Sequence, residues 1–321
     1  MSAKSIPTIH GHNLDRITKL IGDAWPGFDH SMQLQVIDSG WSNINLQIAS
    51  EDEDYVLKLP GLSIRYDENP YEYTWIMHHQ ISKHGLCSKP IFKGRLGDDK
   101  STPFIVLEFI KGEVVTTLGE LSDDEALKVG ATLSLFSDLH PAGVEEFSNV
   151  SEFVESMLVR SSTLVAELPS SSQRTKTQWK QLKESVDRFL QRYADSISWM
   201  PGLMHGDFQE SNIVIGENVK LLDLESCAYG DYRYDIVYLY TQHPSSQDLA
   251  PETRLTDTRL PTDDWDMLAC AALISVLAWS IEWLCNYGLS RHEAILLKGI
   301  SKNEVATYFD RKLAWLQKLL S

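Results

Sequence analysis

The chain has 321 residues, 43% hydrophobic and 23% charged, which is the balance of an ordinary globular protein with room for two domains. The chain has 29 Lys+Arg and 45 Asp+Glu, and the resulting net charge of −16 excludes the broad positive field of a non-specific nucleic-acid binder. The acidic balance fits either plain solubility or a preference for a cationic small substrate, and the composition does not decide between them.

The four cysteines form no C-x-x-C pair and follow no secretory signal. This predicts neither a disulfide framework nor a zinc site and favours a reducing cytoplasm. The most apolar stretch, Met267–Ile281, is shorter than the roughly 20 residues that cross a bilayer. We interpret it as a buried core helix and expect no contact with a membrane.

Helical and strand-like spacings alternate through the first 110 residues. Residues 13–24 have helical spacing, residues 44–48 and 55–59 alternate like strands, and residues 104–107 are strand-like again. A proline at position 70 opens a further helix that stops near Gly85, as helix ends prefer. These elements predict a small β-rich domain with a sheet.

The character changes at Ser122, where Ser122 and Glu125 form a capping box ahead of leucine and alanine residues at intervals of four, from Leu127 to Leu139. Helical patterns then cover 150–168, 175–198, 264–287 and 304–320. The sequence therefore predicts an α+β protein with two lobes: a β-rich lobe over residues 1–110, a connector over residues 108–113 and a mostly helical lobe over residues 114–321. We expect the site in a cleft between them.

Within the helical part, two short apolar runs, 213–215 and 219–222, are joined by the turn-prone residues 216–218 and predict a β-hairpin. Polar residues surround the open end of this hairpin: His205, Asp207 and Asn212 precede or begin the first run, and Asp223 follows the second. Because the two strands are antiparallel, Asn212 and Asp223 are expected to converge although eleven residues separate them.

This set suits phosphoryl transfer. Such a site needs a carboxylate that accepts a hydroxyl proton, and separate oxygen ligands for Mg²⁺ beside the phosphates. Asp207 fits the first task, and Asn212 and Asp223 fit the second. The alternative is that these side chains only cap turns at the strand ends.

The segments HGDFQESNIV and LLDLESCAYGDYRYDI resemble the catalytic loop and the metal-binding segment of the aminoglycoside phosphotransferase and choline kinase family. The resemblance implies a two-lobed protein-kinase-like fold that uses ATP and Mg²⁺ to phosphorylate a hydroxyl of a small molecule. It also implies that Asp207 is the catalytic base, that Asn212 and Asp223 bind the metal, and that His205 supports the loop.

The same resemblance assigns phosphate contacts to Lys58, a lone cation on an apolar strand. Its expected partner is Glu72, on the helix that follows, with Glu68 a weaker choice because it precedes that helix. A lysine at a strand edge can also be purely structural.

A phosphate loop is expected around the segment SGWSN, although it holds a single glycine and an ordinary turn would explain it as well. Its candidate residues are Ser39, Gly40, Ser42 and Asn43. The segment LEFIKGE resembles the family's hinge, where backbone groups of Glu108 and Ile110 are expected to bind adenine; any connector between lobes would look similar.

Candidates for the acceptor pocket are Trp279, Glu282 and Trp283, on a helix where the family places that pocket. Tryptophans four apart share a helix face and can flank an ammonium group by cation–π attraction. Core packing is the alternative. Glu225 is expected either at the metal or substrate or in a structural ion pair, and Asp235 is expected to cap the next helix.

The sequence thus predicts a kinase of small, cationic hydroxyl compounds such as amino alcohols or aminoglycosides. A nucleotide-binding pseudoenzyme that serves as an interaction module is the alternative, but it would be expected to lack one of Lys58, Asp207, Asn212 and Asp223. A protein kinase is disfavoured because no Ala-Pro-Glu segment follows Asp223.

Overall fold

A computed structural model describes residues 13–29, 31–37, 43–51, 53–60, 70–97, 102–193, 199–242, 255, 260–289 and 300–321. The chain divides into two compact units. Among the described residues, unit 1 consists mainly of the segments up to His79 and from Ser88 to Ile110, and unit 2 holds Gln80–Cys87, Lys111–Leu289 and Lys302–Ser321. The main division lies between Ile110 and Lys111, inside the predicted connector.

Unit 1 is built on a five-stranded sheet in the order β1-β2-β3-β5-β4, with every neighbouring pair antiparallel. The predicted strands near 44–48, 55–59 and 104–107 are confirmed. Two strands were not predicted: β1 is short and mostly exposed, and β4 carries Lys93, Gly94 and Arg95, which interrupt the apolar pattern. The strands are β1 (Gln33–Val36), β2 (Asn43–Ala49), β3 (Tyr55–Pro60), β4 (Pro90–Leu96) and β5 (Thr102–Glu108).

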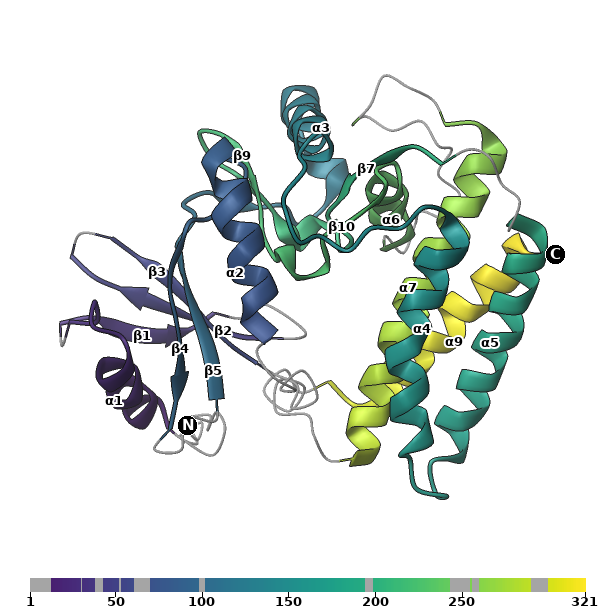
Figure 1. Cartoon of the computed structure of the whole chain (residues 1–321), viewed down its shortest axis with the longest axis horizontal. Helices are drawn as coiled ribbons and strands as arrows, with labels where there is room; N and C mark the ends of the chain where they lie inside the picture. Colours follow the sequence, from purple (N-terminus) through teal and green to yellow (C-terminus); the bar gives the residue numbers. More distant parts are fainter. Residues whose placement is uncertain are drawn as a thin grey trace. The chain divides into compact units, whose positions relative to one another are not determined.

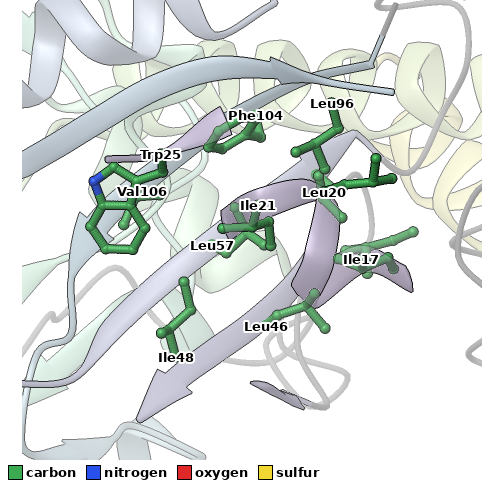
Figure 2. Packing of buried hydrophobic residues seen from close by; sticks show 12 residues of the cluster. Ile17, Leu20, Ile21, Trp25, Leu46, Ile48, Leu57, Leu96, Phe104 and Val106 are labelled. Atoms are coloured by element: carbon green, nitrogen blue, oxygen red, sulfur yellow. The ribbon is translucent and has the colours of Figure 1, made fainter. Parts of the chain in front are cut away.

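Helix α1 (Leu14–Ala24) covers one face of this sheet and confirms the predicted helix. The side chain of Asn13 caps its first turn by accepting a hydrogen bond from the backbone N–H of Arg16, at 2.9 Å. Figure 2 shows its apolar side chains packed against those of β2, β3 and β5. The buried set in this cluster includes Ile17, Leu20, Ile21, Leu46, Ile48, Leu57, Phe104 and Val106.

Helix α2 (Pro70–Ile81) lies against the other face. Its Tyr71 and Trp75 pack with Ile105 and Leu107 of β5, which alternate with the residues that face α1. The helix continues as the short turn Ser82–His84 and ends at Gly85, whose φ of 75° is the left-handed conformation that favours glycine. The predicted start and stop of this helix are both confirmed.

Unit 2 is mostly helical, and α7 is its central helix (Figure 1). Helix α7 packs against α4, α5, α6 and α9. Its segment Thr262–Tyr287 is long and apolar enough to cross a membrane, but 89% of its most apolar window is buried inside the protein, as in a core helix. The helices are α3 (Asp123–Ser137), α4 (Val150–Ala166), α5 (Gln173–Tyr193), α6 (Tyr234–Gln242), α7 (Thr262–Leu289) and α9 (Lys302–Leu319).

Helix α3 begins with the predicted capping box, in which Ser122 and Glu125 satisfy each other's backbone N–H groups. The predicted apolar face was wrong: Leu127 and Leu135 are 57% and 60% exposed. The buried face is offset by about half a turn and includes Val129, Leu133 and Phe136. Spacing alone did not show which of the two apolar stripes on this helix faces the core.

Two small sheets support the segment that carries the polar residues. The predicted hairpin is confirmed as β8 (Ile213–Ile215) and β9 (Val219–Leu221), and β6 (Glu113–Val114) pairs with β8. Strands β7 (Pro201–Met204) and β10 (Ala228–Asp231) form a separate antiparallel pair. The loop that carries His205 and Asp207 therefore begins at the end of β7 and leads into β8.

Candidate active site

His205 is fully buried at the start of this loop. Its Nε2 lies 2.7 Å from the carbonyl oxygen of Leu222, which can only accept, so Nε2 carries the proton. Its Nδ1 then accepts a hydrogen bond from the backbone N–H of Asp207, at 3.3 Å. The imidazole thus ties the loop to the strand end at Leu222 and presents no surface to a ligand.

The next residue, Gly206, has to be glycine for two reasons. Its φ of 79° is the left-handed conformation that side chains disfavour. A Cβ atom here would also lie 2.2 Å from the carbonyl oxygen of Ser226. The close approach of these two backbones brings the loop against the segment that follows β9.

Asp207 is partly exposed, and hydrogen bonds hold its carboxylate on both oxygens. The hydroxyl of Tyr238 donates to Oδ1 at 2.9 Å. The amides of Gln209 and Asn212 both donate to Oδ2, each at 3.1 Å. The amide of Asn212 also donates to the backbone carbonyl of Asp207 at 2.8 Å. The carboxylate is therefore fixed before any substrate binds.

Burial raises the pKa of Asp207 to about 7, and the negative charges of Asp223 and Glu225 act in the same direction. The hydrogen bonds from Tyr238 and Asn212 oppose this shift because they stabilise the carboxylate. A carboxylate whose pKa is raised in this way is a stronger base than one in water.

Asn212 and Asp223 converge as the hairpin predicts. The backbone N–H of Leu222 donates to the carbonyl of Asn212 at 2.9 Å, which places Asp223 beside the end of the loop. Asp223 has φ 57° and ψ 58°, and within the described residues it is the one non-glycine residue with positive φ. Such backbone strain is frequent at functional sites.

These two residues fit Mg²⁺ by the chemistry of their donors. The amide nitrogen of Asn212 is used on Asp207, which leaves its Oδ1 as a neutral oxygen donor, and Asp223 supplies a carboxylate. Within the described residues, no group of three or more His, Cys, Asp or Glu side chains suited to a metal ion is found. Two protein oxygens suit Mg²⁺, which takes its other ligands from phosphates and water.

The expectation that Asp235 caps the following helix was wrong. Asp235 is fully buried in the first turn of α6, and it accepts hydrogen bonds from the backbone N–H groups of His205, at 2.6 Å, and Gly206, at 2.9 Å. Burial raises its pKa to about 7, and these two N–H donors oppose the shift. Asp235 therefore anchors the loop to α6. Neither this role nor that of Tyr238 was predicted, although their spacing of three on one helix places them on the same face.

In unit 1, Lys58 is 3% exposed and lies in β3, paired with Asn45 of β2 and Ile105 of β5. The carboxylate of Glu72 forms an ion pair with Lys93 of β4, and both of these side chains are partly exposed. The expected contact between Lys58 and Glu72 stays a prediction.

Other nucleotide candidates have structural partners or lie outside the described residues. Asn43 begins β2 and accepts a hydrogen bond from the hydroxyl of Tyr71, at 3.1 Å. The backbone N–H of Glu108 donates to the carbonyl of Lys89, so this N–H is not available to a base. Ile110 is partly exposed at the end of unit 1. Ser39, Gly40, Ser42 and Glu68 lie outside the described residues.

The acceptor-pocket candidates on α7 differ in exposure and in their partners. Trp283 is fully buried, which favours core packing over a place beside a ligand. Trp279 is partly exposed and packs on Trp283, with ring centroids 4.9 Å apart. Glu282 is mostly buried and pairs with Arg160 at 3.3 Å, so its charge is already compensated. Glu225 lies in the turn Leu224–Ser226 after Asp223 and is partly exposed.

Comparison with known proteins gives a consistent result. Residues 33–270 match the model of the phosphotransferase enzyme family. No curated protein sequence matches the chain. Among solved structures, the choline kinase LicA from Streptococcus pneumoniae is similar at a TM-score of 0.61 and 15% identity, covering 95% of this chain and 98% of that one.

Two aminoglycoside kinases are similar as well, and each match covers 95% of this chain and 98% of the other. A thermostable mutant of aminoglycoside phosphotransferase APH(4)-Ia, in a ternary complex with ADP and hygromycin B, has a TM-score of 0.57 at 11% identity. Spectinomycin phosphotransferase APH(9)-Ia, in complex with ADP and spectinomycin, has a TM-score of 0.56 at 14% identity. At these identities the likeness shows the fold.

Proposed function

Because the chain belongs to the phosphotransferase enzyme family, we propose that it transfers the γ-phosphoryl group of ATP to a hydroxyl of a small, cationic acceptor with the help of Mg²⁺. The observation that carries this proposal is the carboxylate of Asp207, held by three side-chain donors beside the converging pair Asn212 and Asp223.

In the proposed reaction, Asp207 accepts the proton of the acceptor hydroxyl. The hydroxyl oxygen forms a bond to the γ-phosphorus while the bond from that phosphorus to the bridging oxygen breaks, and the electron pair leaves with ADP. Little covalent chemistry is required of the protein, so most of the rate comes from positioning and from neutralising charge. The hydrogen bonds that fix Asp207 serve the positioning.

Asn212, through Oδ1, and Asp223, through its carboxylate, would hold Mg²⁺. The ion would neutralise charge that develops on the phosphate oxygens. Contacts within the protein fix the positions of these two side chains. Asn212 is held by its two hydrogen bonds to Asp207, and the left-handed backbone of Asp223 fixes the direction of its side chain.

In this proposal Lys58 contacts the α- and β-phosphates of ATP, and Glu72 or Glu68 is the ion-pair partner of Lys58. The loop residues Ser39, Gly40, Ser42 and Asn43 would contact phosphate through backbone N–H groups and hydroxyls. Adenine would contact backbone groups of Glu108 and Ile110 other than the Glu108 N–H, which is already used.

A cationic acceptor is supported by the charges around the base. Asp223 and Glu225 both raise the pKa of Asp207, so negative charge is concentrated around this carboxylate. An ammonium group near them would be stabilised by charge, and the partly exposed ring of Trp279 is the remaining aromatic candidate on α7. Amino alcohols and aminoglycosides both have this chemistry. We place the reaction in the cytoplasm, since the four cysteines are free thiols.

The test is ADP release by the purified protein with Mg-ATP against choline, ethanolamine, several aminoglycosides, homoserine, thiamine and neutral sugars. Mass spectrometry of the acceptor should show the added phosphoryl group. We expect a cationic compound to be phosphorylated. Phosphorylation of a neutral sugar alone would overturn the acceptor class, and labelled phosphate on protein alone would overturn the small-molecule assignment.

A further inference from the structure

We infer that Tyr238 is a positioning residue for phosphoryl transfer: its hydroxyl holds Asp207 so that one lone pair of Oδ1 is presented to the acceptor hydroxyl. This inference rests on the proposed role of Asp207 as the base. It adds a residue of α6 that is remote in sequence from the catalytic loop.

The two oxygens of Asp207 differ in their hydrogen bonds. A carboxylate oxygen has two in-plane lone-pair sites. On Oδ2 both are used, by the amides of Gln209 and Asn212. On Oδ1 the described residues supply a single donor, the hydroxyl of Tyr238 at 2.9 Å. Oδ1 is therefore the atom with room for a second donor, and the acceptor hydroxyl is that donor in the proposed reaction.

The Tyr238 hydroxyl decides where this remaining lone pair points. Without it, the carboxylate is held at Oδ2 alone and can rotate about its Cβ–Cγ bond while keeping one of its amide donors. With it, the plane of the carboxylate is fixed by contacts at both oxygens. Burial and the charge of Asp207 raise the pKa of Tyr238 well above its ordinary value, so the phenol keeps its proton and remains a donor.

Helix α6 is built to keep Tyr238 in place. Asp235, one turn earlier, binds the backbone N–H groups of His205 and Gly206, so the same helix face holds both the backbone of the loop and the side chain of its base. The ring of Tyr238 is 8% exposed and packs on Tyr234, with centroids 5.6 Å apart.

The other end of α6 is held from α9. The ammonium group of Lys312 donates to the carbonyl of Thr241 in the last turn of α6, where a positive charge suits the helix dipole. Lys312 lies beyond the residues matched by the family model, so this support comes from the C-terminal part of the chain.

The experiment compares Tyr238→Phe with Tyr234→Phe, the same change on the same buried helix at a hydroxyl that is not among the donors to Asp207. For an acceptor that the wild type phosphorylates, we expect Tyr238→Phe to lower kcat about 10- to 100-fold while KM for Mg-ATP stays within about twofold. Tm should stay within about 5 °C of the wild type. Tyr234→Phe should keep a near-normal kcat.

A double-mutant cycle separates positioning from a general structural effect. In an Asp207→Asn background the base is gone, so adding Tyr238→Phe should lower the residual kcat by less than about twofold. If the two changes multiply instead, Tyr238 acts independently of Asp207 and the inference fails. It also fails if Tyr238→Phe alone turns over like Tyr234→Phe. Should Asp207→Asn itself keep wild-type turnover, the proposed base would be wrong, which is a distinct result.

Discussion

The loop that carries Asp207 and the middle of α7 were both predicted to contribute to the site, and their side chains lie in different surroundings. In the loop, Asp207 is bound by three side chains and Asp235 binds the backbone N–H groups of His205 and Gly206. On α7, Trp283 is fully buried and Glu282 is paired with Arg160. Clustered polar residues at strand ends indicated a site, whereas aromatic spacing on a helix did not distinguish a pocket from the core.

A large effect on turnover is expected at Asp223, the proposed metal ligand. Asp223→Asn keeps a residue type that tolerates the left-handed backbone but removes the charge that would bind Mg²⁺. We expect turnover to fall about 100-fold or more, with the Mg²⁺ concentration for half-maximal rate shifted upward. A titration of rate against Mg²⁺ measures both; an unchanged half-saturation would remove Asp223 from the metal site.

The next effect is on stability and concerns Trp283 in the middle of α7. Trp283→Ala should lower the free energy of unfolding by about 3–5 kcal/mol because it leaves a cavity in the core. At a temperature where the variant is folded, KM for the acceptor should be unchanged. Urea denaturation and steady-state kinetics check the two parts. A raised acceptor KM at normal stability would return Trp283 to the pocket.

A smaller effect is expected at Lys312, which supports α6 from α9. Burial lowers its pKa to about 8. Between pH 8 and the ordinary lysine pKa of about 10.4, the unfolded chain therefore binds a proton that the folded chain has released, and stability rises with pH. The free energy of unfolding of the wild type minus that of Lys312→Met should rise by about 2–3 kcal/mol across this window.

The prediction concerns the difference in free energy of unfolding between the wild type and Lys312→Met. Tyrosines and cysteines that titrate in the same pH range affect both proteins alike, so their contributions cancel in this difference. Lys318→Met, at a lysine in the last turn of the same helix, controls for the loss of a positive charge from α9. A wild-type-minus-Lys312→Met difference that stays flat with pH would show that the ammonium group is not buried in solution.

Much of the fold could be predicted because its signals are local. The capping box at Ser122, the glycine stop at Gly85 and the hairpin of β8 and β9 each depend on a few neighbouring residues, and all three are confirmed. The buried face of α3 was mispredicted because that helix carries two apolar stripes about half a turn apart, and only its tertiary neighbours decide between them.

Some residues of the candidate site could likewise be predicted from local motifs, whereas others depend on tertiary packing. The resemblance placed Asp207 and Asn212 in one motif and Asp223 in a second, and the hairpin brings Asn212 and Asp223 together. Asp235 and Tyr238 act on the loop across 30 and 31 residues of sequence, and an N-cap was the best local interpretation of an aspartate before an apolar helix. Contacts of this kind depend on how α6 packs, which local patterns do not contain.

The central claim is that Asp207 is the base of a phosphoryl transfer, and the most direct test is Asp207→Asn with turnover and nucleotide binding measured on the same preparation. The change removes the charge while keeping the size of the side chain. We predict that phosphorylation of the acceptor falls by about 100- to 10,000-fold while the affinity for Mg-ATP stays within a few-fold. Near-normal turnover with intact nucleotide binding would contradict this account.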